Sequence, residues 1–161
     1  MSETVNVAVR LRPFNAREKE RNSKCCVRIE GKTCTLAHPS GNEGLNRRFT
    51  FDHVFDSFHE GSAQCATQRT VWEHIGRPVL EAAWDGYNVS LFAYGQTGSG
   101  KSHSMVGFDS TDKGIIPKAC EQMFERIGAN DDADLSFRVE CSMLEIYNEK
   151  VRDLFVPFAP N

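Results

Sequence analysis

The chain has 161 residues and a mass of 18.1 kDa, the size of a single globular domain. Hydrophobic residues make up 40% and charged residues 25%, which excludes disordered, collagen-like and low-complexity proteins. The formal net charge is −3, but residues 1–48 carry 10 Lys/Arg against 5 Asp/Glu and residues 49–161 carry 9 against 17, so the balance changes from +5 to −8. Neither part has the dense basic stripe of a nucleic-acid-binding protein, and we expect no nucleic-acid partner.

Two features of the chain bear on its compartment. No apolar run approaches the roughly 20 residues that span a bilayer, and residues 1–4 lack the basic start of a secretory signal. The cysteines form no C-x-x-C pair, so we expect neither a zinc site nor disulfides, but reduced and buried thiols. They are Cys25, Cys26, Cys34, Cys65, Cys120 and Cys141. We therefore expect a cytoplasmic protein without membrane insertion.

The N-terminal third of the chain predicts short strands around one charged surface segment. Alternating apolar residues over 5–11 predict a strand that ends at Pro13. The highly charged stretch 14–24 suits a short surface helix or a loop. Glycine and proline interrupt the β-like pieces of 25–52, where we expect a small antiparallel group with a loop near residues 39–46.

A helix and a buried strand are predicted next. Apolar residues at helical spacing over 67–84 predict an amphipathic helix, in which Pro78 introduces a kink. Residues 89–94 are apolar except for one serine, which is the pattern of a strand buried on both faces. This strand leads directly into the glycine-rich segment 95–102.

The remaining pattern continues the alternation of helices and strands. A helix is predicted from Lys101, with an interruption around 107–114 and a continuation over 115–127. Alternating residues over 135–143 predict another strand, and 144–155 adds one more with a turn. Strand, helix, buried strand, helix and strand in this order indicate the α/β class.

Two further sets of residues could form sites but are interpreted as structural. Trp72 and Trp84 on the amphipathic helix are expected to be core or rim residues rather than a ligand cage. The acidic residues after the last helix could ligate a metal, but a charged turn of this kind is usually solvated. They are Asp131, Asp132 and Asp134.

The segment after the buried strand carries the chemistry. Its eight residues fit the pattern G-x-x-x-x-G-K-[ST]: Gly95, Gln96, Thr97, Gly98, Ser99, Gly100, Lys101 and Ser102. The glycines allow backbone N–H groups to approach phosphate oxygens, and Lys101 supplies a positive charge to the β- and γ-phosphates. The Ser102 hydroxyl is expected to take one position on Mg²⁺. The alternative is a glycine-rich turn, but its place between a strand and a helix favours phosphate binding.

The chain resembles kinesin motor domains in four blocks that occur in the same order as in that family. The most specific is Gly86-Tyr87-Asn88-Val89-Ser90-Leu91-Phe92-Ala93-Tyr94, which leads into the loop above. The other blocks are residues 7–15 with their Arg-x-Arg-Pro sequence, residues 114–117, and residues 144–154 with Glu-Ile-Tyr-Asn-Glu. Ser102 and Asn88-Val89 resemble the vesicle-transporting branch.

This resemblance implies roles for four residues outside the phosphate loop. Arg10, Arg12 and Pro13 correspond to the wall on the adenine side of the family's nucleotide site. His103 corresponds to the residue that closes the other side of the base. From the residues alone, the arginines would be surface charges and His103 an ordinary residue of a first helical turn.

The resemblance also implies a fold and a function. The fold would be a P-loop NTPase core of the kinesin type, with a mixed central sheet flanked by helices and incomplete at its C-terminal side. Residues 1–161 would be the N-terminal portion of one motor domain, the ATP-binding part of a microtubule motor of the cytoskeleton, with ATP or ADP, Mg²⁺ and tubulin as partners.

The sequence departs from the family in two blocks. Asn-x-x-Ser-Ser-Arg-Ser-His and Asp-Leu-Ala-Gly-Ser-Glu, which respond to the γ-phosphate in kinesins, do not occur in these residues. Without them we expect the chain alone to be inactive in hydrolysis, with no catalytic residue of its own. A truncated nucleotide-binding or regulatory module is the alternative function, and another P-loop enzyme, such as a small kinase, is a third.

Overall fold

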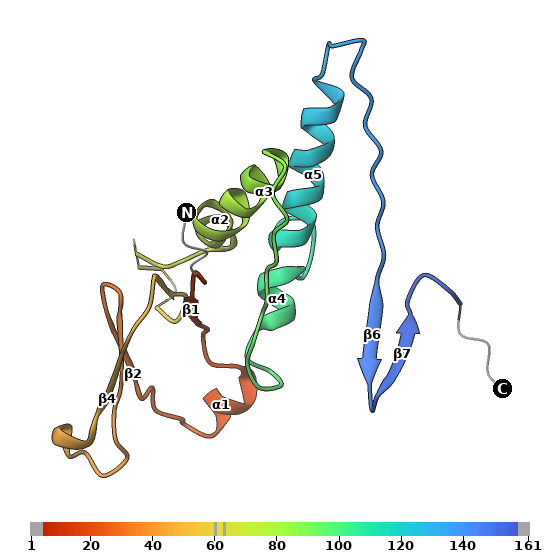
Figure 1. Ribbon diagram of the computed structural model, residues 1–161. Helices are drawn as coiled ribbons and strands as arrows, with labels where there is room; N and C mark the ends of the chain where they lie inside the picture. Colours follow the sequence, from red (N-terminus) through yellow and green to blue (C-terminus); the bar gives the residue numbers. More distant parts are fainter. Residues whose placement is uncertain (1–4, 60, 63, 158–161) are drawn as a thin grey trace. The chain divides into compact units, whose positions relative to one another are not determined.

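The computed structural model describes residues 5–59, 61–62 and 64–157; residues 1–4, considered above as a possible signal sequence, lie outside this part. The chain forms two compact units with the boundary after Phe124 (Figure 1). Over the described residues, no helix combines the length and the apolar character needed to cross a membrane.

The first unit is built on a pair of parallel strands. β1 (Ala8–Leu11) pairs with β5 (His53–Asp56), with Ala8 opposite His53. β1 is shorter than the predicted strand 5–11, and the following charged stretch forms the short helix α1 (Ala16–Glu20). Asn15 and Glu18 close the N-terminus of α1 with a reciprocal capping box, which explains why the helix begins there.

The residues between β1 and β5 form a separate antiparallel sheet, as the sequence predicted. Its strands are β2 (Val27–Glu30), β3 (Thr33–Leu36) and β4 (Arg47–Thr50), in that spatial order. The predicted loop near residues 39–46 joins β3 to β4 and contains the short 3₁₀ helix η1 (Glu43–Leu45).

The predicted amphipathic helix is present but has an irregular centre. It consists of α2 (Gln68–Val71), the π-helical turn η2 (Trp72–Gly76) and α3 (Arg77–Trp84). Pro78 lies in the first turn of α3, where its missing N–H costs least, so the irregularity is the π-helical turn before it. At Gly76 an added Cβ would lie 2.3 Å from Cε3 of Trp72, so the indole ring occupies the space of a side chain there.

The interrupted helix is also confirmed. α4 (Lys101–Met105) follows the glycine-rich loop, and α5 (Ile115–Gly128) resumes after a connecting loop. Gly107 and Lys113 form an isolated antiparallel bridge at the base of that loop, and the N–H of Gly114 donates to the carbonyl of Val106 at 2.9 Å. The loop between α4 and α5 is therefore closed at its base by backbone contacts.

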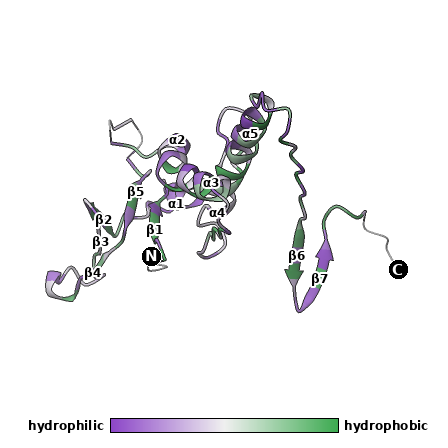
Figure 2. Ribbon diagram, turned by 45° about the horizontal axis from the view of Figure 1, so that its top comes forward, coloured by the Kyte–Doolittle hydropathy of each residue, from purple (hydrophilic) through white to green (hydrophobic). Residues whose placement is uncertain are grey.

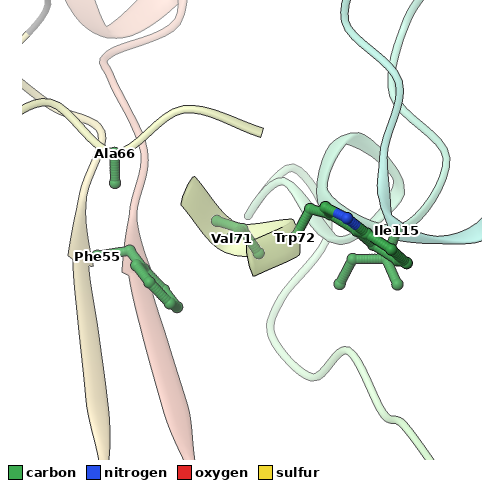
Figure 3. Packing of buried hydrophobic residues seen from close by; sticks show 5 residues of the cluster. All are labelled: Phe55, Ala66, Val71, Trp72 and Ile115. Atoms are coloured by element: carbon green, nitrogen blue, oxygen red, sulfur yellow. The ribbon is translucent and has the colours of Figure 1, made fainter. Parts of the chain in front are cut away.

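The core of the first unit joins β5, α2 and α5. Five buried hydrophobic residues form the core cluster: Phe55, Ala66, Val71, Trp72 and Ile115 (Figure 3). Five half-buried side chains pack around them: Ile75, Leu80, Leu91, Met105 and Ala119. Trp72 lies across Ile115, as Figure 3 shows, and is the most buried of the cluster at 3% exposure. Of the two tryptophans expected to be core or rim residues, Trp72 is a core residue and Trp84 is 40% exposed.

Two predicted strands are wrong. Residues 89–94 are extended but unpaired, and Phe92 and Tyr94 are 86% and 101% exposed instead of buried. Residues 135–143 likewise form no strand. A strand forms only when another strand satisfies its backbone N–H and C=O groups along its length, and the described strands pair with one another instead of with these stretches. Apolar composition alone therefore does not make residues 89–94 a strand.

The second unit contains one β-hairpin. β6 (Leu144–Tyr147) pairs antiparallel with β7 (Lys150–Asp153), and Asn148 and Glu149 both have left-handed backbone conformations in the two-residue turn. Such a turn matches the twist of the two strands it connects. Figure 2 shows that the two strands differ in hydropathy, with β6 the more hydrophobic. The acidic residues predicted to form a solvated turn before them are exposed.

The α/β class is confirmed, with one qualification. The mixed central sheet is represented by the parallel pair β1–β5, and the other described strands form two separate sheets.

All six cysteines lie in the described part of the chain and are free thiols, but only Cys34 is buried. The expectation of buried thiols is wrong for the others because Cys25, Cys26, Cys120 and Cys141 lie on exposed segments and Cys65 is half-buried.

Candidate functional site

The glycine-rich loop forms a tight connection from the extended residues 89–94 to α4. The N–H of Ser99 donates to the carbonyl of Gln96 at 3.1 Å, which closes a turn inside the loop. Gly100 has φ of +96° at the N-cap of α4, a left-handed conformation that a residue with a Cβ rarely adopts. The motif glycines therefore allow the backbone to turn directly into α4, and this turn leaves Gln96, Thr97 and Gly98 exposed.

Lys101 is folded back over this loop. Its Nζ donates to the carbonyl oxygens of Gly95 at 2.8 Å and Gln96 at 2.9 Å. An ammonium group has three N–H donors, so these two bonds leave a donor for an anion at the loop. Ser102 is exposed in the first turn of α4, next to this ammonium group in sequence.

A groove of about 280 Å³ lies between this loop and the region of α1. Its charged lining residues are three arginines and one glutamate, so the groove is positive and suits an anion. The lining residues are Arg12, Asn15, Arg17, Glu18, Arg21, Ser23, Gln96, Thr97 and Gly98. Figure 1 shows the loop before α4 descending toward α1. A larger cavity of about 660 Å³ next to β5 contains none of the predicted site residues.

Arg12 forms a two-pronged ion pair with Glu18 at this groove. Nη1 lies 2.7 Å from Oε2 and Nη2 lies 2.8 Å from Oε1, and Nη1 also donates to the carbonyl of Pro13 at 2.7 Å. The bonds from Arg12, with a further bond from the backbone N–H of Asn15, lower the pKa of Glu18 to about 2. The same pair raises the pKa of Arg12. The Arg12 guanidinium therefore lies at the groove in a fixed orientation.

Replacing Glu18 by glutamine is expected to remove a pH-dependent part of the stability. The folded-state pKa of about 2 is below the ordinary value of 4.5, so the ionised carboxylate stabilises the fold above about pH 4.5. This contribution is lost as the pH falls from about 4.5 to about 2. Urea unfolding between pH 7 and pH 2 should show parent and Glu18→Gln converging at the acidic end. Glu20→Gln, on the same helix, is the control. A difference that stays constant with pH would contradict this assignment.

Arg10 is engaged by the protein itself. Nε donates to Oγ of Ser57 at 2.9 Å, and Nη1 donates to Oε1 of Gln68 at 2.7 Å and to Oγ of Ser104 at 3.0 Å. Burial lowers the pKa of Arg10, and the negative charge of Asp112 partly offsets this effect. The guanidinium thus links β1 to α2 and α4. This arrangement differs from a side chain presented freely to a base, which the family resemblance implied.

His103 is held by the loop between α4 and α5. Its Nε2 lies 2.6 Å from Oδ2 of Asp112, and its ring lies 4.8 Å from the ring of Phe108 at a tilt of 34°. Its carbonyl oxygen accepts a hydrogen bond from Nε2 of Gln68 at 2.5 Å. The ring is half-buried and its orientation is defined by contacts on both its edge and its face.

The predicted site residues therefore fall into two groups. Arg12 and the loop residues Gln96 to Gly98 line one groove, whereas Arg10 and His103 are joined through Gln68 and Ser104. Sequence reasoning missed Gln68, Asp112 and Glu18. The pattern Asn-x-x-Glu at residues 15–18 is a capping signal that could have identified Glu18. Nothing local distinguishes Gln68 from a surface residue of its helix.

The described residues offer no protein cage for a metal. No group of three His, Cys, Asp or Glu side chains among them is arranged to hold an ion. This includes the acidic turn at residues 131–134. Mg²⁺ is commonly held by one or two protein oxygens with water and phosphate oxygens, so a single hydroxyl such as that of Ser102 is compatible with this ion.

Comparisons of the sequence with a family model and with known proteins identify the same family. The kinesin motor domain family matches residues 10–160. The chain is 47% identical over 156 residues to the kinesin-like protein unc-104 of Caenorhabditis elegans, covering 96% of this chain and 10% of unc-104. It is 45% identical over 157 residues to the kinesin-like protein KIF1C of Homo sapiens, covering 96% of this chain and 14% of KIF1C.

Solved structures give the same result. A KIF14 dimer with AMP-PNP in complex with a microtubule has a TM-score of 0.90 and 42% identity, covering all of this chain and 43% of that one. KIF14 with ADP in complex with a microtubule has a TM-score of 0.88 at 42% identity, covering 98% of this chain and 43% of that one. The chain therefore spans less than half of these solved motor chains and at most 14% of the two curated relatives above.

Proposed function

Because the chain belongs to the kinesin motor domain family, we propose that it binds ATP and ADP at the groove between the glycine-rich loop and the region of α1. The observation that carries this proposal is the loop itself. A turn rich in left-handed glycines is followed at once by Lys101, and the ammonium group lies against the loop carbonyls. Gly95, Gln96, Thr97, Gly98, Ser99, Gly100, Lys101 and Ser102 would hold the phosphates through backbone N–H groups and the lysine charge.

The base would lie between Pro13 and His103. A proline ring and a planar imidazole ring are both suited to packing on a purine, and His103 is already oriented by Asp112 and Phe108. Arg12 would complete the wall from the side of α1, where its pairing with Glu18 fixes its position. Arg10 would support this wall through its protein contacts.

The metal in this proposal is Mg²⁺ at Ser102. The hydroxyl would take one position of the ion, and the phosphate oxygens and water would take the others. Bound Mg²⁺ neutralises charge on the phosphates. The chain's own contribution is to place an exposed hydroxyl one residue after the lysine.

In the longer protein, this chain would be the ATP-binding part of a motor that couples hydrolysis to movement along microtubules. KIF14, which has this fold, is found in complex with a microtubule with either ADP or AMP-PNP. Such a protein would be cytoplasmic and associated with the cytoskeleton. Similarity to unc-104 and KIF1C, together with Ser102 and Asn88-Val89, supports the vesicle-transporting branch.

Binding and turnover can be tested on the same preparation. We expect the chain to bind a fluorescent ATP analogue saturably in the presence of Mg²⁺, and inorganic tripolyphosphate to displace it, because both ligands use the same loop. We also expect no acceleration of phosphate release by polymerised tubulin, since residues 49–161 carry a charge of −8 toward an acidic filament. If tripolyphosphate does not displace the ATP analogue, so that binding depends on the base alone, the result would argue against the phosphate loop. Stimulated turnover would show that this chain contains the filament contacts.

A further inference from the structure

We propose that Gln68 is a positioning residue for base recognition. This proposal rests on the nucleotide site proposed above. Gln68 is the first residue of α2 and is only 6% exposed. The phosphate loop and α4 lie more than 25 residues later in the chain. A polar side chain buried to this extent is costly unless all its hydrogen-bonding groups are used. In Gln68 both ends of the amide are used.

The amide of Gln68 has one possible orientation. Its Oε1 accepts from Nη1 of Arg10 at 2.7 Å, while its Nε2 donates to the carbonyl of His103 at 2.5 Å and to the carbonyl of Asp112 at 3.4 Å. Rotating the amide by half a turn would place its NH₂ group against the guanidinium and its oxygen against two carbonyl oxygens. The donor end of Gln68 is therefore committed to the segment that carries His103.

The two carbonyl groups that accept from Gln68 belong to His103 and Asp112, whose side chains also contact each other. Asp112 binds the imidazole of His103 through its carboxylate, at 2.6 Å from Nε2. Gln68 therefore holds both the backbone of the residue that presents the ring and the backbone of the residue that orients it. Loss of the amide would allow these two segments to move relative to each other.

The other end of the amide is anchored in the sheet. Arg10 on β1 also donates to Ser57, which is 7% exposed and whose hydroxyl donates to the carbonyl of Ala66 at 2.6 Å. This chain of buried and partly buried hydrogen bonds connects the end of β5 through Arg10 and Gln68 to His103. The position of the His103 ring is thus coupled to the sheet by hydrogen bonds that do not involve Lys101. Among the described residues, Nζ of Lys101 donates to carbonyl oxygens of its own loop.

This arrangement predicts a loss confined to the base. Gln68→Met keeps the length of the side chain without its hydrogen bonds, and Gln68→Glu keeps an acceptor for Arg10 but removes the donor. Each should weaken binding of Mg·ATP by on the order of 10-fold, about the effect of losing one or two buried hydrogen bonds. Binding of inorganic tripolyphosphate should change less than twofold, because the phosphate loop is untouched. Gln122→Met on α5, the same chemical change, is the matched control.

A double-mutant cycle separates positioning from general stabilisation. In a His103→Ala background, adding Gln68→Met should produce no further loss of ATP affinity, since the ring that Gln68 positions is absent. An additive loss in the cycle, equal losses for ATP and tripolyphosphate, or unchanged ATP affinity in both Gln68 variants would overturn the proposal. If Gln68→Met does not fold, Gln68→Glu gives the same comparison because it retains the bond to Arg10.

Lys101→Ala distinguishes this proposal from the proposed function. It should weaken binding of both Mg·ATP and tripolyphosphate, whatever the role of Gln68. If Lys101→Ala changes neither affinity, the nucleotide site itself is wrong. If it weakens both while the Gln68 variants leave the ratio of the two affinities unchanged, only the positioning role of Gln68 is wrong.

Discussion

Replacing Lys101 by alanine is expected to reduce the affinity for Mg·ATP by on the order of 100-fold, since a hydrogen bond to a charged group is worth roughly 1.5–3 kcal/mol and the lysine charge acts on more than one phosphate oxygen. The substitution also removes the bonds from Nζ to the carbonyls of Gly95 and Gln96. The loop then loses both its cation and the contacts that hold its first two residues.

The affinity is measured by titration with a fluorescent ATP analogue. Lys150→Ala is the matched control because it removes the same charge from an exposed residue of β7, which does not line the groove. The control should bind as the parent does. Equal affinities for parent and Lys101→Ala would reject the phosphate-loop assignment, and equal losses in both variants would mean that only net charge is sensed.

Replacing Trp72 by alanine is expected to destabilise the first unit by about 3–5 kcal/mol, the usual cost of truncating a buried large aromatic residue. Trp72 is 3% exposed and lies across Ile115 in a cluster of only five buried hydrophobic residues. A cavity in so small a core has few neighbours that can move to fill it. Since the free energy of unfolding of a domain is itself about 5–15 kcal/mol, this is a large fraction of the stability.

Urea unfolding followed by circular dichroism measures this effect. Trp84→Ala is the matched control: it removes the same side chain from the last turn of α3, where Trp84 is 40% exposed. We expect its loss to be less than half that of Trp72→Ala. If the two substitutions cost the same, the indole of Trp72 is not the centre of the core.

Local signals in the sequence were sufficient for much of the fold and for the loop. The motif at residues 95–102, the helix starting at Lys101 and its interruption depend on glycines and on neighbours a few residues away, and the structure places the loop and helices as predicted. The antiparallel strands β2 to β4 are similar, since short turns bring consecutive segments together. Such features need no information from distant parts of the chain.

Features that depend on distant partners were not predicted. Residues 89–94 have the composition of a buried strand, but pairing is a property of two segments, and the described chain supplies no second one there. Arg10 has the same difficulty. Its acceptors Ser57, Gln68 and Ser104 are 47, 58 and 94 residues away in sequence, so its role as a half-buried link could not be derived from the segment around it.

The contact between Gly76 and Trp72 limits how this part of the chain can change. An added Cβ at Gly76 would lie 2.3 Å from Cε3 and 2.6 Å from Cζ3 of the indole ring, and 3.1 Å from Cγ2 of Ile115. Gly76 can therefore gain a side chain only when position 72 has already lost its large ring, and that first step removes the main aromatic residue of the core. The effect of any substitution at Gly76 therefore depends on which residue occupies position 72, so the two positions are expected to be epistatic.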